Sequence, residues 1–439
     1  MKKKLLALLL ALSMALALAA CGGNNTTADT AGNNTAGNDT AGNNAAGNTQ
    51  QTDDGGDAAG ADITIGMICI HDQNSGYDVA HIDGLTAACE ALGIDVNSQV
   101  IFRYNIAEDE TCEDTAIDLA EEGCDIIFSD SYGHQTYMLS AAEQYPDVTF
   151  VACTGDQAGV AGLDNFKNIF PYTYESRYVS GVVAGMKLQE LMADGTVTDP
   201  KVGYVGAYPY AEVVCGYTAF LLGIQSIVPE AYMEVQYTNS WYDPTAESEA
   251  ANALMANGCV IIGQHADSTG APSAVQVALE SGTVAYSVGY NIDMLSVAPE
   301  AALTSAQNNW SVLYQATLEK FIAGEEIPAD YATGCADGAV MISALGPSCA
   351  EGTQEKVDEV WAGIADGSLK VFDTSTFTVG GETVTEYEVN FSIIDFNTGT
   401  VIYEGPTENV ISDGVFQESV YRSAPYFDLR IDGITELNS

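Results

Sequence analysis

The most constraining feature of this sequence is a regular alternation of short branched-aliphatic runs with segments of helical periodicity, which begins at Asp62. Gly93 and Gly123 follow the first two helical segments and are expected to end them. Such an array predicts a parallel sheet with helices on both faces. The predicted strands are 63–70, 100–104, 125–128 and 148–152, and the predicted helices are 77–92, 111–122 and 135–144.

A second array of the same kind begins after Pro171. In its segment 212–227 the apolar residues form one stripe at helical spacing, so the aromatic residues of this helix are predicted to lie in the core. The predicted helices are 174–192, 212–227, 244–257 and 271–280, and the predicted strands are 202–206, 234–238, 260–263 and 284–288.

The two arrays predict an α/β fold with two doubly wound parallel sheets, one in each lobe. Residues 62–171 and about 292–328, including a helix at 310–322, are expected to form lobe 1, and 172–291 and about 329–439 lobe 2. Open α/β sheets bind ligands at the carboxyl ends of their strands, so a cleft between the lobes is expected. In the tail, 372–405 alternates like β-hairpins, with predicted turns at 380–381 and 397–399.

The N-terminal region carries an export signal. Three Lys residues precede an apolar run, which leads into two Ala residues and Cys21. This predicts a lipoprotein signal peptide at 1–20 and a lipid-modified Cys21 that anchors the chain outside the bacterial cell membrane; an ordinary signal peptide with an incidental Cys is the alternative. Residues 21–61, rich in Ala, Gly, Asn, Thr and Asp with a recurring TAGNN unit, are expected to form a flexible linker.

Charge and cysteine content exclude several classes of function. The formal net charge is −48, and a surface this acidic repels nucleic acid and anionic lipid head groups. Beyond Cys21, nine Cys residues include no C-x-x-C motif, and no metal or cofactor is expected. Cys335 and Cys349 are the one candidate pair for a local disulfide. Buried, structural roles are expected for Cys69, Cys124, Cys153, Cys215 and Cys259.

The common catalytic motifs are missing. The sequence contains no Walker A motif, no G-x-S-x-G elbow and no pair of His residues at helical spacing, and no G-x-G-x-x-G follows the first strand. A binding protein is therefore favoured over an enzyme. An enzyme acting on nucleosides would need a carboxylate and a His, for which Asp267 with His265 or Asp78 with His81 could serve.

The loops after the predicted strands contain aromatic, amide, hydroxyl and carboxylate groups, but no Lys or Arg. Tyr77, Tyr132, Trp241 and the nearby Trp310 suit a flat ring that is neutral or weakly basic and lies between aromatic faces. Phosphate and carboxylate ligands are disfavoured. The alternative is that each aromatic side chain packs beneath its own loop.

Short motifs in these loops carry a resemblance to a known family. They are NSGYDVAH (74–81), SYG (131–133), YESRYVSG (174–181), PYAEV (209–213), SWYDP (240–244), QHADS (264–268) and NNW (308–310). In this order, over roughly residues 62–375, they resemble the basic membrane protein (BMP, PnrA-like) family of ABC transporter substrate-binding lipoproteins. The resemblance implies a two-lobed type I periplasmic-binding fold that closes on a purine nucleoside or a related heterocycle.

The family's motifs imply roles for particular residues. Tyr77 matches the ring-stacking aromatic after the first strand, Asp78 the polar residue beside it, and Trp241 the aromatic that faces it from the second lobe. Two positions depart from the nucleoside-binding pattern, because Asn291 and Asn308 stand where an Asp and a Lys resemble ribose contacts. The subgroup with G-[WY]-x-x-A-H, H-x-D-S and N-W resembles members that take the free base.

The resemblance therefore favours a free purine such as adenine or hypoxanthine, with a nucleoside as the alternative. The expected partners are an ABC permease and its ATPase, and the protein is expected to be a monomer that contacts the membrane only through its lipid. A receptor that reports the ligand without transport would share these features. The predicted ligand-binding residues are Tyr77, Asp78, His81, Ser131, Tyr132, Glu212, Trp241, His265, Asp267, Asn291 and Trp310.

Overall fold

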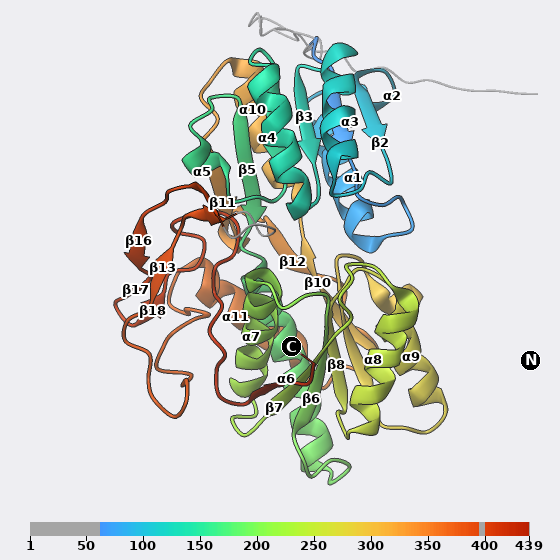
Figure 1. Ribbon diagram of the computed structural model, residues 1–439. Coiled ribbons are helices and arrows are strands. Elements are labelled where there is room, and N and C mark those ends of the chain that lie inside the picture. The colour runs from blue at the N-terminus through green and yellow to red at the C-terminus, as the bar shows by residue number, and fades with distance from the viewer. Residues whose placement is uncertain (1–61, 395–399, 439) are drawn as a thin grey trace, which may run out of the picture. The chain divides into compact units, whose positions relative to one another are not determined.

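The computed structural model describes residues 62–394 and 400–438, which contain two α/β units built on separate sheets (Figure 1). The predicted signal peptide, Cys21, the linker to residue 61 and the turn at 397–399 lie outside these residues. We call the unit on the first sheet, sheet A, lobe 1, and the unit on the second sheet, sheet B, lobe 2. None of the described helices is long and apolar enough to cross a membrane.

Sheet A has six parallel strands in the order β11-β5-β4-β3-β1-β2. Its strands are β1 (Ile65–Ile68), β2 (Val100–Arg103), β3 (Ile126–Ser129), β4 (Thr149–Ala152), β5 (Phe166–Pro171) and β11 (Asp330–Thr333). Its helices are α1 (Gly76–Ala91), α2 (Val96–Gln99), α3 (Glu110–Glu121), α4 (Gln135–Gln144), α5 (Ala158–Ala161) and α10 (Trp310–Ala323), with a 3-10 turn at Tyr132–His134.

Helices cover both faces of sheet A because successive strand residues point to opposite sides. Met67 of β1 is buried in the cluster that includes residues of α1 and α10. Its neighbour Ile68 is buried in the cluster formed with α3 and α4. Two apolar layers therefore enclose the sheet, as the uninterrupted aliphatic runs predicted.

Sheet B has seven strands in the order β12-β10-β9-β8-β6-β7-β19, and only β12 is antiparallel to its neighbour. Its strands are β6 (Lys201–Gly206), β7 (Tyr232–Tyr237), β8 (Ile261–His265), β9 (Tyr286–Tyr290), β10 (Ala302–Asn308), β12 (Val340–Ile342) and β19 (Ile434–Glu436). Its helices are α6 (Thr173–Ala193), α7 (Ala211–Gln225), α8 (Pro244–Ala256), α9 (Gly270–Glu280) and α11 (Thr353–Ala365), with 3-10 turns at Met294–Ser296 and Cys335–Asp337.

Helices α6 and α7 pack with their backbones in contact. A Cβ atom at Gly181 of α6 would lie 2.1 Å from the carbonyl oxygen of Phe220, and one at Gly223 of α7 would lie 2.1 Å from that of Tyr178. Only glycine permits this approach. On the other face of sheet B, α8 and α9 pack with strand residues such as Val205 in a separate cluster.

The predicted fold class is confirmed, since both units are α/β with parallel sheets. The chain crosses between the sheets at other points than the predicted lobe boundaries. Strand β10, expected in lobe 1, pairs with β9 and β12 in sheet B, whereas β11, expected in lobe 2, pairs with β5 in sheet A. Helix α10 between them packs in lobe 1.

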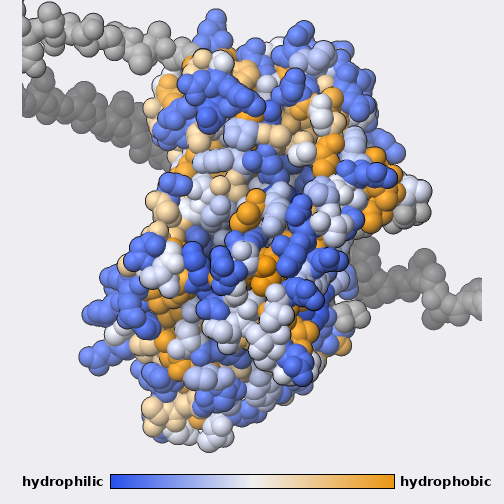
Figure 2. All heavy atoms as spheres, turned by 90° about the vertical axis from the view of Figure 1, so that its left-hand side faces the viewer, coloured by the Kyte–Doolittle hydropathy of each residue, from blue (hydrophilic) through white to orange (hydrophobic). Residues whose placement is uncertain are grey.

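The C-terminal segment, residues 372–394 and 400–438, forms short antiparallel pairs apart from sheets A and B. Its core is aromatic: the rings of Phe372 and Phe427 stack with 4.3 Å between centroids. The turn predicted at 380–381 is confirmed, because Val379 pairs with Glu382 across it. Figure 2 shows hydrophobic residues scattered among hydrophilic ones on the side where this segment lies. Its strands are β13 (Glu388–Asn390) with β16 (Thr407–Asn409), β14 (Ile393–Ile394) with β15 (Val401–Tyr403), and β17 (Ile411–Ser412) with β18 (Val415–Phe416).

The cysteines of the described residues are all free thiols. Cys335 and Cys349, the candidate pair for a disulfide, are half-buried free thiols. The five cysteines predicted to be small buried residues are buried: Cys69, Cys124, Cys153, Cys215 and Cys259.

Candidate functional site

A cavity lies where the strand order of each sheet reverses. In sheet A, β1 lies between β2 and β3, and in sheet B, β6 lies between β7 and β8. The connections leave these strands in opposite directions and open a crevice at the carboxyl ends. The space between its lining atoms, open solvent included, is about 380 Å³. It is lined by Ile70, Tyr77, Ser131, Tyr132 and Thr154 of lobe 1, and by Glu212, Trp241, His265, Asp267 and Tyr290 of lobe 2.

On the lobe 1 side, hydrogen bonds fix the two tyrosine rings. Tyr77 lies in the first turn of α1, and its hydroxyl donates to the carbonyl oxygen of Asp130 at 2.6 Å. The hydroxyl of Tyr132 donates to Asp156 Oδ2 at 2.8 Å. Because the hydroxyl groups are engaged with the protein, each tyrosine presents its ring rather than its polar end to the cavity.

On the lobe 2 side, Trp241 lies in the loop before α8. The N-cap Asp243 and the following Pro244 begin this helix, and Asp243 accepts hydrogen bonds from two backbone amides of its first turn. The amide of Asp267 donates to the carbonyl oxygen of Trp241 at 2.8 Å. The indole packs edge-on against Tyr208 with 5.2 Å between centroids. Backbone contacts therefore hold the loop, and the indole wall is supported from behind.

Two carboxyl groups and an imidazole supply the polar wall of lobe 2. His265 Nε2 lies 3.3 Å from Glu212 Oε1. A Cβ atom at Gly216 would lie 2.6 Å from His265 Nδ1, so glycine at this position of α7 makes room for the imidazole. Asn291 Nδ2 donates to Asp267 Oδ1 at 3.0 Å, which orients the carboxyl group of Asp267.

Burial shifts the pKa values of these groups toward their neutral forms. Burial raises the pKa of Glu212 to about 7, although the positive charge of Arg177 opposes the rise. Burial also raises the pKa of Asp267 well above its ordinary value, and the negative charge of Glu247 adds to this. The pKa of His265 is lowered well below its ordinary value by burial and by the charge of Arg177. Near pH 7 the cavity therefore offers carboxyl groups that can donate as well as accept hydrogen bonds.

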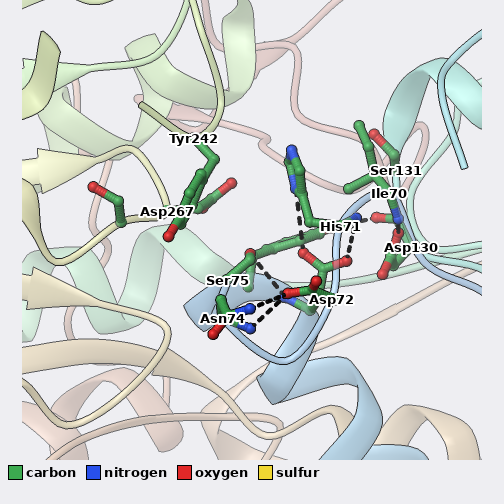
Figure 3. A network of polar contacts seen from close by, with 12 residues as sticks. Ile70, His71, Asp72, Asn74, Ser75, Asp130, Ser131, Tyr242 and Asp267 are labelled. Carbon is green, nitrogen blue, oxygen red and sulfur yellow. Dashed lines mark hydrogen bonds and ion pairs between the residues drawn. The ribbon is translucent and has the colours of Figure 1, made fainter. Parts of the chain in front are cut away.

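The two lobes touch beside the cavity. The amide of Gly76, at the start of α1, donates to the carbonyl oxygen of Asp267 at 3.3 Å. The rings of His71 and Tyr242 lie 5.5 Å apart between centroids. Figure 3 shows His71 and Ser75 of the lobe 1 loop near Asp267 and Tyr242 of lobe 2. Because the lobes are in contact here, the cleft between them is closed on this side.

Comparison with known proteins identifies the family of this chain. The model of the PnrA-like ABC transporter substrate-binding protein family (Bmp) matches residues 69–374. This chain belongs to that family. The resemblance found in the sequence is thus confirmed.

Two curated relatives differ in the ligand that their names give. A purine-binding protein of Brucella abortus (strain 2308) is 32% identical over 297 residues, which are 68% of this chain and 79% of the relative. A Haloferax volcanii protein, named as a candidate ABC transporter glucose-binding protein, is 33% identical over 258 residues, 59% of this chain and 61% of the relative.

Solved structures share the fold of the PnrA-like protein. An ABC transporter solute-binding protein of Aeropyrum pernix K1 has a TM-score of 0.60 at 17% identity, covering 71% of this chain and 93% of the neighbour. One from Conexibacter woesei has a TM-score of 0.55 at 21% identity, covering 70% and 98%. At these identities the likeness shows the fold.

Seven of the eleven predicted site residues line the cavity of the PnrA-like protein. The other four lie behind it. His81 is buried one turn below Tyr77, with its Nδ1 2.6 Å from the Tyr314 hydroxyl. Its ring packs at a tilt against Trp310, with 3.8 Å between centroids. Trp310 is a core residue of lobe 1. Asn291 contacts Asp267 as described above.

Asp78, the fourth, is also buried behind the cavity, where it supports a loop of lobe 1. Its Oδ1 accepts the His71 amide at 2.8 Å, and its Oδ2 lies 3.5 Å from His71 Nδ1. Burial raises the pKa of Asp78, but hydrogen bonds from His71 and Ser75 outweigh it and leave the pKa below its ordinary value. Asp78 therefore holds the loop after β1 rather than lining the cavity.

Four residues near the cavity were not among the predicted ones. Ile70, Thr154 and Tyr290 line it. Arg177 of α6 is buried behind Tyr290, with its guanidinium carbon 3.6 Å from the centre of that ring and Nη1 donating to the Gln264 carbonyl oxygen at 2.7 Å. The described residues that line the cavity include no Lys or Arg. The positive charge of Arg177 lies behind this lining.

Proposed function

We propose that this PnrA-like protein binds a purine between its two lobes, with a free base such as adenine or hypoxanthine favoured over a nucleoside. The observation that carries the proposal is the composition of the cavity: aromatic rings from both lobes, Tyr77 and Trp241, together with the carboxyl groups of Glu212 and Asp267. A planar heterocycle stacks on such rings, and its edge nitrogens pair with the carboxyl groups.

The protonation of the carboxyl groups supports a base whose edge places a donor next to an acceptor. Burial raises the pKa of Glu212 to about 7, so near neutral pH its carboxyl group can donate one hydrogen bond and accept another. Adenine and hypoxanthine both present a donor beside an acceptor. No cationic side chain lines the described cavity, which disfavours phosphorylated ligands.

The sequence relatives support a purine but leave other ligands to be tested. The Brucella abortus relative is named a purine-binding protein, whereas the Haloferax volcanii relative is named for glucose. A nucleoside is the second choice, because Asn291 and Asn308 stand where the nucleoside-binding pattern has an Asp and a Lys. In this structure Asn291 holds Asp267 and Asn308 accepts from Thr173.

The proposed role is delivery of the bound purine, unchanged, to the permease of an ABC importer driven by its ATPase. The protein would act as a monomer outside the cytoplasmic membrane, anchored through lipid on Cys21. A receptor that reports the ligand without transport is the alternative. If the protein serves a purine importer, uptake of the labelled base by cells should depend on it.

Adenine or hypoxanthine is expected to raise the melting temperature. A ligand that binds only the folded state stabilises it by about 2.7 kcal/mol when present at a hundred times its Kd. A calorimetric and thermal-shift panel of adenine, hypoxanthine, guanine, adenosine, inosine and glucose tests this. Tighter binding of adenosine or inosine than of every base would select the nucleoside, and a response to glucose alone would reject a purine.

The purine is expected to leave the protein unaltered. Chromatography of inosine or adenosine after prolonged incubation with the protein should show no free base. Release of base that is lost in the Asp267→Asn variant would place the protein among enzymes instead.

Replacing Cys21 with Ser is expected to remove the membrane anchor. The proposed lipid is attached to the thiol of this residue, and a hydroxyl in its place leaves the chain without its acyl groups. Fractionation of cells should then move the protein from the membrane pellet to the soluble fraction. The variant Cys335→Ser is the matched control, and membrane retention of Cys21→Ser would contradict a lipid anchor.

A further inference from the structure

The C-terminal segment continues beyond the part of the chain that matches the family, which ends at residue 374. Most of this segment packs on lobe 2. Phe377, Phe416 and Phe427 are buried in the apolar cluster that also contains residues of α6 and α7. Strand β19 then adds a parallel edge to β7 of sheet B. The segment is thus an integral part of lobe 2.

The same segment also contacts lobe 1. Arg422 Nη1 lies 3.1 Å from Asp156 Oδ2, in the loop between β4 and α5. The next residue, Ser423, donates its amide to Asp330 Oδ1 of β11 at 2.9 Å. Figure 1 shows the red C-terminal ribbon beside β11. Residues 422–423 therefore join lobe 2 to lobe 1 by polar contacts.

The guanidinium of Arg422 is held by its own segment before it reaches Asp156. Its Nε donates to the carbonyl oxygen of Ala424 at 3.2 Å, and its Nη2 donates to that of Pro425 at 3.3 Å. Its central carbon lies 5.4 Å from the ring centre of Phe391 and 5.8 Å from that of Tyr426. Because these contacts fix the planar group, little conformational freedom is left to lose when Nη1 pairs with the carboxylate.

Asp156 connects Arg422 to Tyr132, which lines the cavity. The oxygen that accepts from Arg422, Oδ2, also accepts from the hydroxyl of Tyr132 at 2.8 Å. The amide of Asp156 donates to Gln135 Oε1 at 2.7 Å, which fixes the backbone of the loop. The side chains of Arg422 and Asp156 are only 19% and 10% exposed, so solvent screens their attraction weakly.

We propose that Arg422 is a positioning residue of the ligand site, which acts through Asp156 on the ring of Tyr132. The C-terminal segment of lobe 2 thereby sets a wall of the cavity that belongs to lobe 1. The effect on affinity rests on the proposed function, whereas the effect on the order of the Tyr132 loop does not. Without Arg422, the carboxylate loses its charged partner, and the tyrosine loses a fixed acceptor.

The Arg422→Gln variant is expected to bind adenine or hypoxanthine about tenfold more weakly than the wild type in calorimetry. Arg430→Gln is the matched control. Arg430 lies in the same segment and pairs with Asp428 and Glu436, away from Asp156. Its replacement is expected to change the Kd by less than twofold. Equal losses in the two variants would show a general effect of the segment and overturn the proposal.

A double-mutant cycle separates positioning from a merely structural role. In a Tyr132→Phe protein, which lacks the hydroxyl that Asp156 accepts, Arg422→Gln is expected to cause little further loss of affinity. Additive losses would overturn the proposal. If Arg422→Gln does not fold, Asp156→Asn breaks the same link from lobe 1 and is expected to weaken binding to a similar degree; unchanged affinity in that variant contradicts the link.

Hydrogen exchange of the protein without ligand tests the link independently of any purine. The backbone amides of residues 131–136 are expected to exchange faster in Arg422→Gln than in the wild type, and at the wild-type rate in Arg430→Gln. This result would support the positioning role even if no purine bound and the proposed function failed. Unchanged exchange in Arg422→Gln would overturn the role even if a purine bound.

Discussion

Replacing Trp241 with Ala is expected to weaken purine binding about ten- to a hundredfold, because stacking of a base on an aromatic ring contributes ~1–3 kcal/mol. This substitution removes the indole and leaves the backbone contact of the loop in place. The loop is held through the backbone carbonyl oxygen of Trp241, which accepts the Asp267 amide at 2.8 Å, and alanine retains that group. Calorimetry with the base that binds tightest in the ligand panel measures the loss directly.

The conservative variant Trp241→Phe keeps an aromatic face and should recover most of the lost affinity. Trp361→Ala is the matched control, since Trp361 lies in a groove between α11 and β12, away from the cavity. Wild-type affinity in Trp241→Ala would show that the indole only packs beneath its loop. Purine recognition would then fall to the tyrosine rings of the cavity.

The fold was largely predictable from the sequence because local patterns determined most of its elements. Helix α4 has the predicted bounds, Gln135–Gln144, and β1 lies within the aliphatic run that predicted it. The sequence of β10, ALTSAQN, does not suggest a strand, because it holds one branched-aliphatic residue, Leu303, among small and polar ones. Tertiary contacts hold its polar residues in the sheet: the Thr304 hydroxyl donates to the Ser343 carbonyl oxygen at 3.0 Å.

Site residues that follow a strand could be predicted from their position in the sequence. Residues whose place depends on tertiary packing could not. Residues that directly follow strands, such as Ser131 and Asp267, reach the cavity because parallel strands end at one edge. His81 lies on the same helix face as Tyr77 but one turn deeper, where Tyr77 covers it and Trp310 packs on it. The residue type suggested His81 as a ligand contact, but its position beneath Tyr77 buries it behind the cavity.

Contacts between distant segments leave no local pattern from which they could be predicted. Arg422 and Asp156 are 266 positions apart, and neither belongs to a motif. Arg177 does stand in a motif, YESRYVSG, but its burial behind Tyr290 depends on the close packing of α6 and α7. The surroundings of a charged group in the interior are therefore a result of the tertiary structure, as is its pKa.

Glu418 is expected to make the protein less stable as the pH rises. Its side chain is 5% exposed, and Oε1 accepts the amide of Tyr426 at 2.9 Å. Burial raises its pKa from 4.5 to about 8, although that hydrogen bond and the charge of Arg422 oppose the rise. A raised pKa means that the folded protein holds a proton that the unfolded chain releases. The contribution of Glu418 to the free energy of unfolding is therefore greatest below pH 4.5 and falls until the pH exceeds 8.

The Glu418→Gln variant should lose this dependence, because glutamine keeps the acceptor oxygen and does not titrate. From pH 6 to pH 9, the free energy of unfolding of the wild type should fall relative to that of the variant by on the order of 3 kcal/mol, at 1.36 kcal/mol per pKa unit. Urea unfolding at both pH values measures the difference. The exposed Glu404→Gln in the same segment is the control, and it should follow the wild type, because the repulsion among the remaining acidic groups is common to all three proteins. Parallel curves for the wild type and Glu418→Gln would mean that Glu418 is already ionised in the folded protein at pH 6.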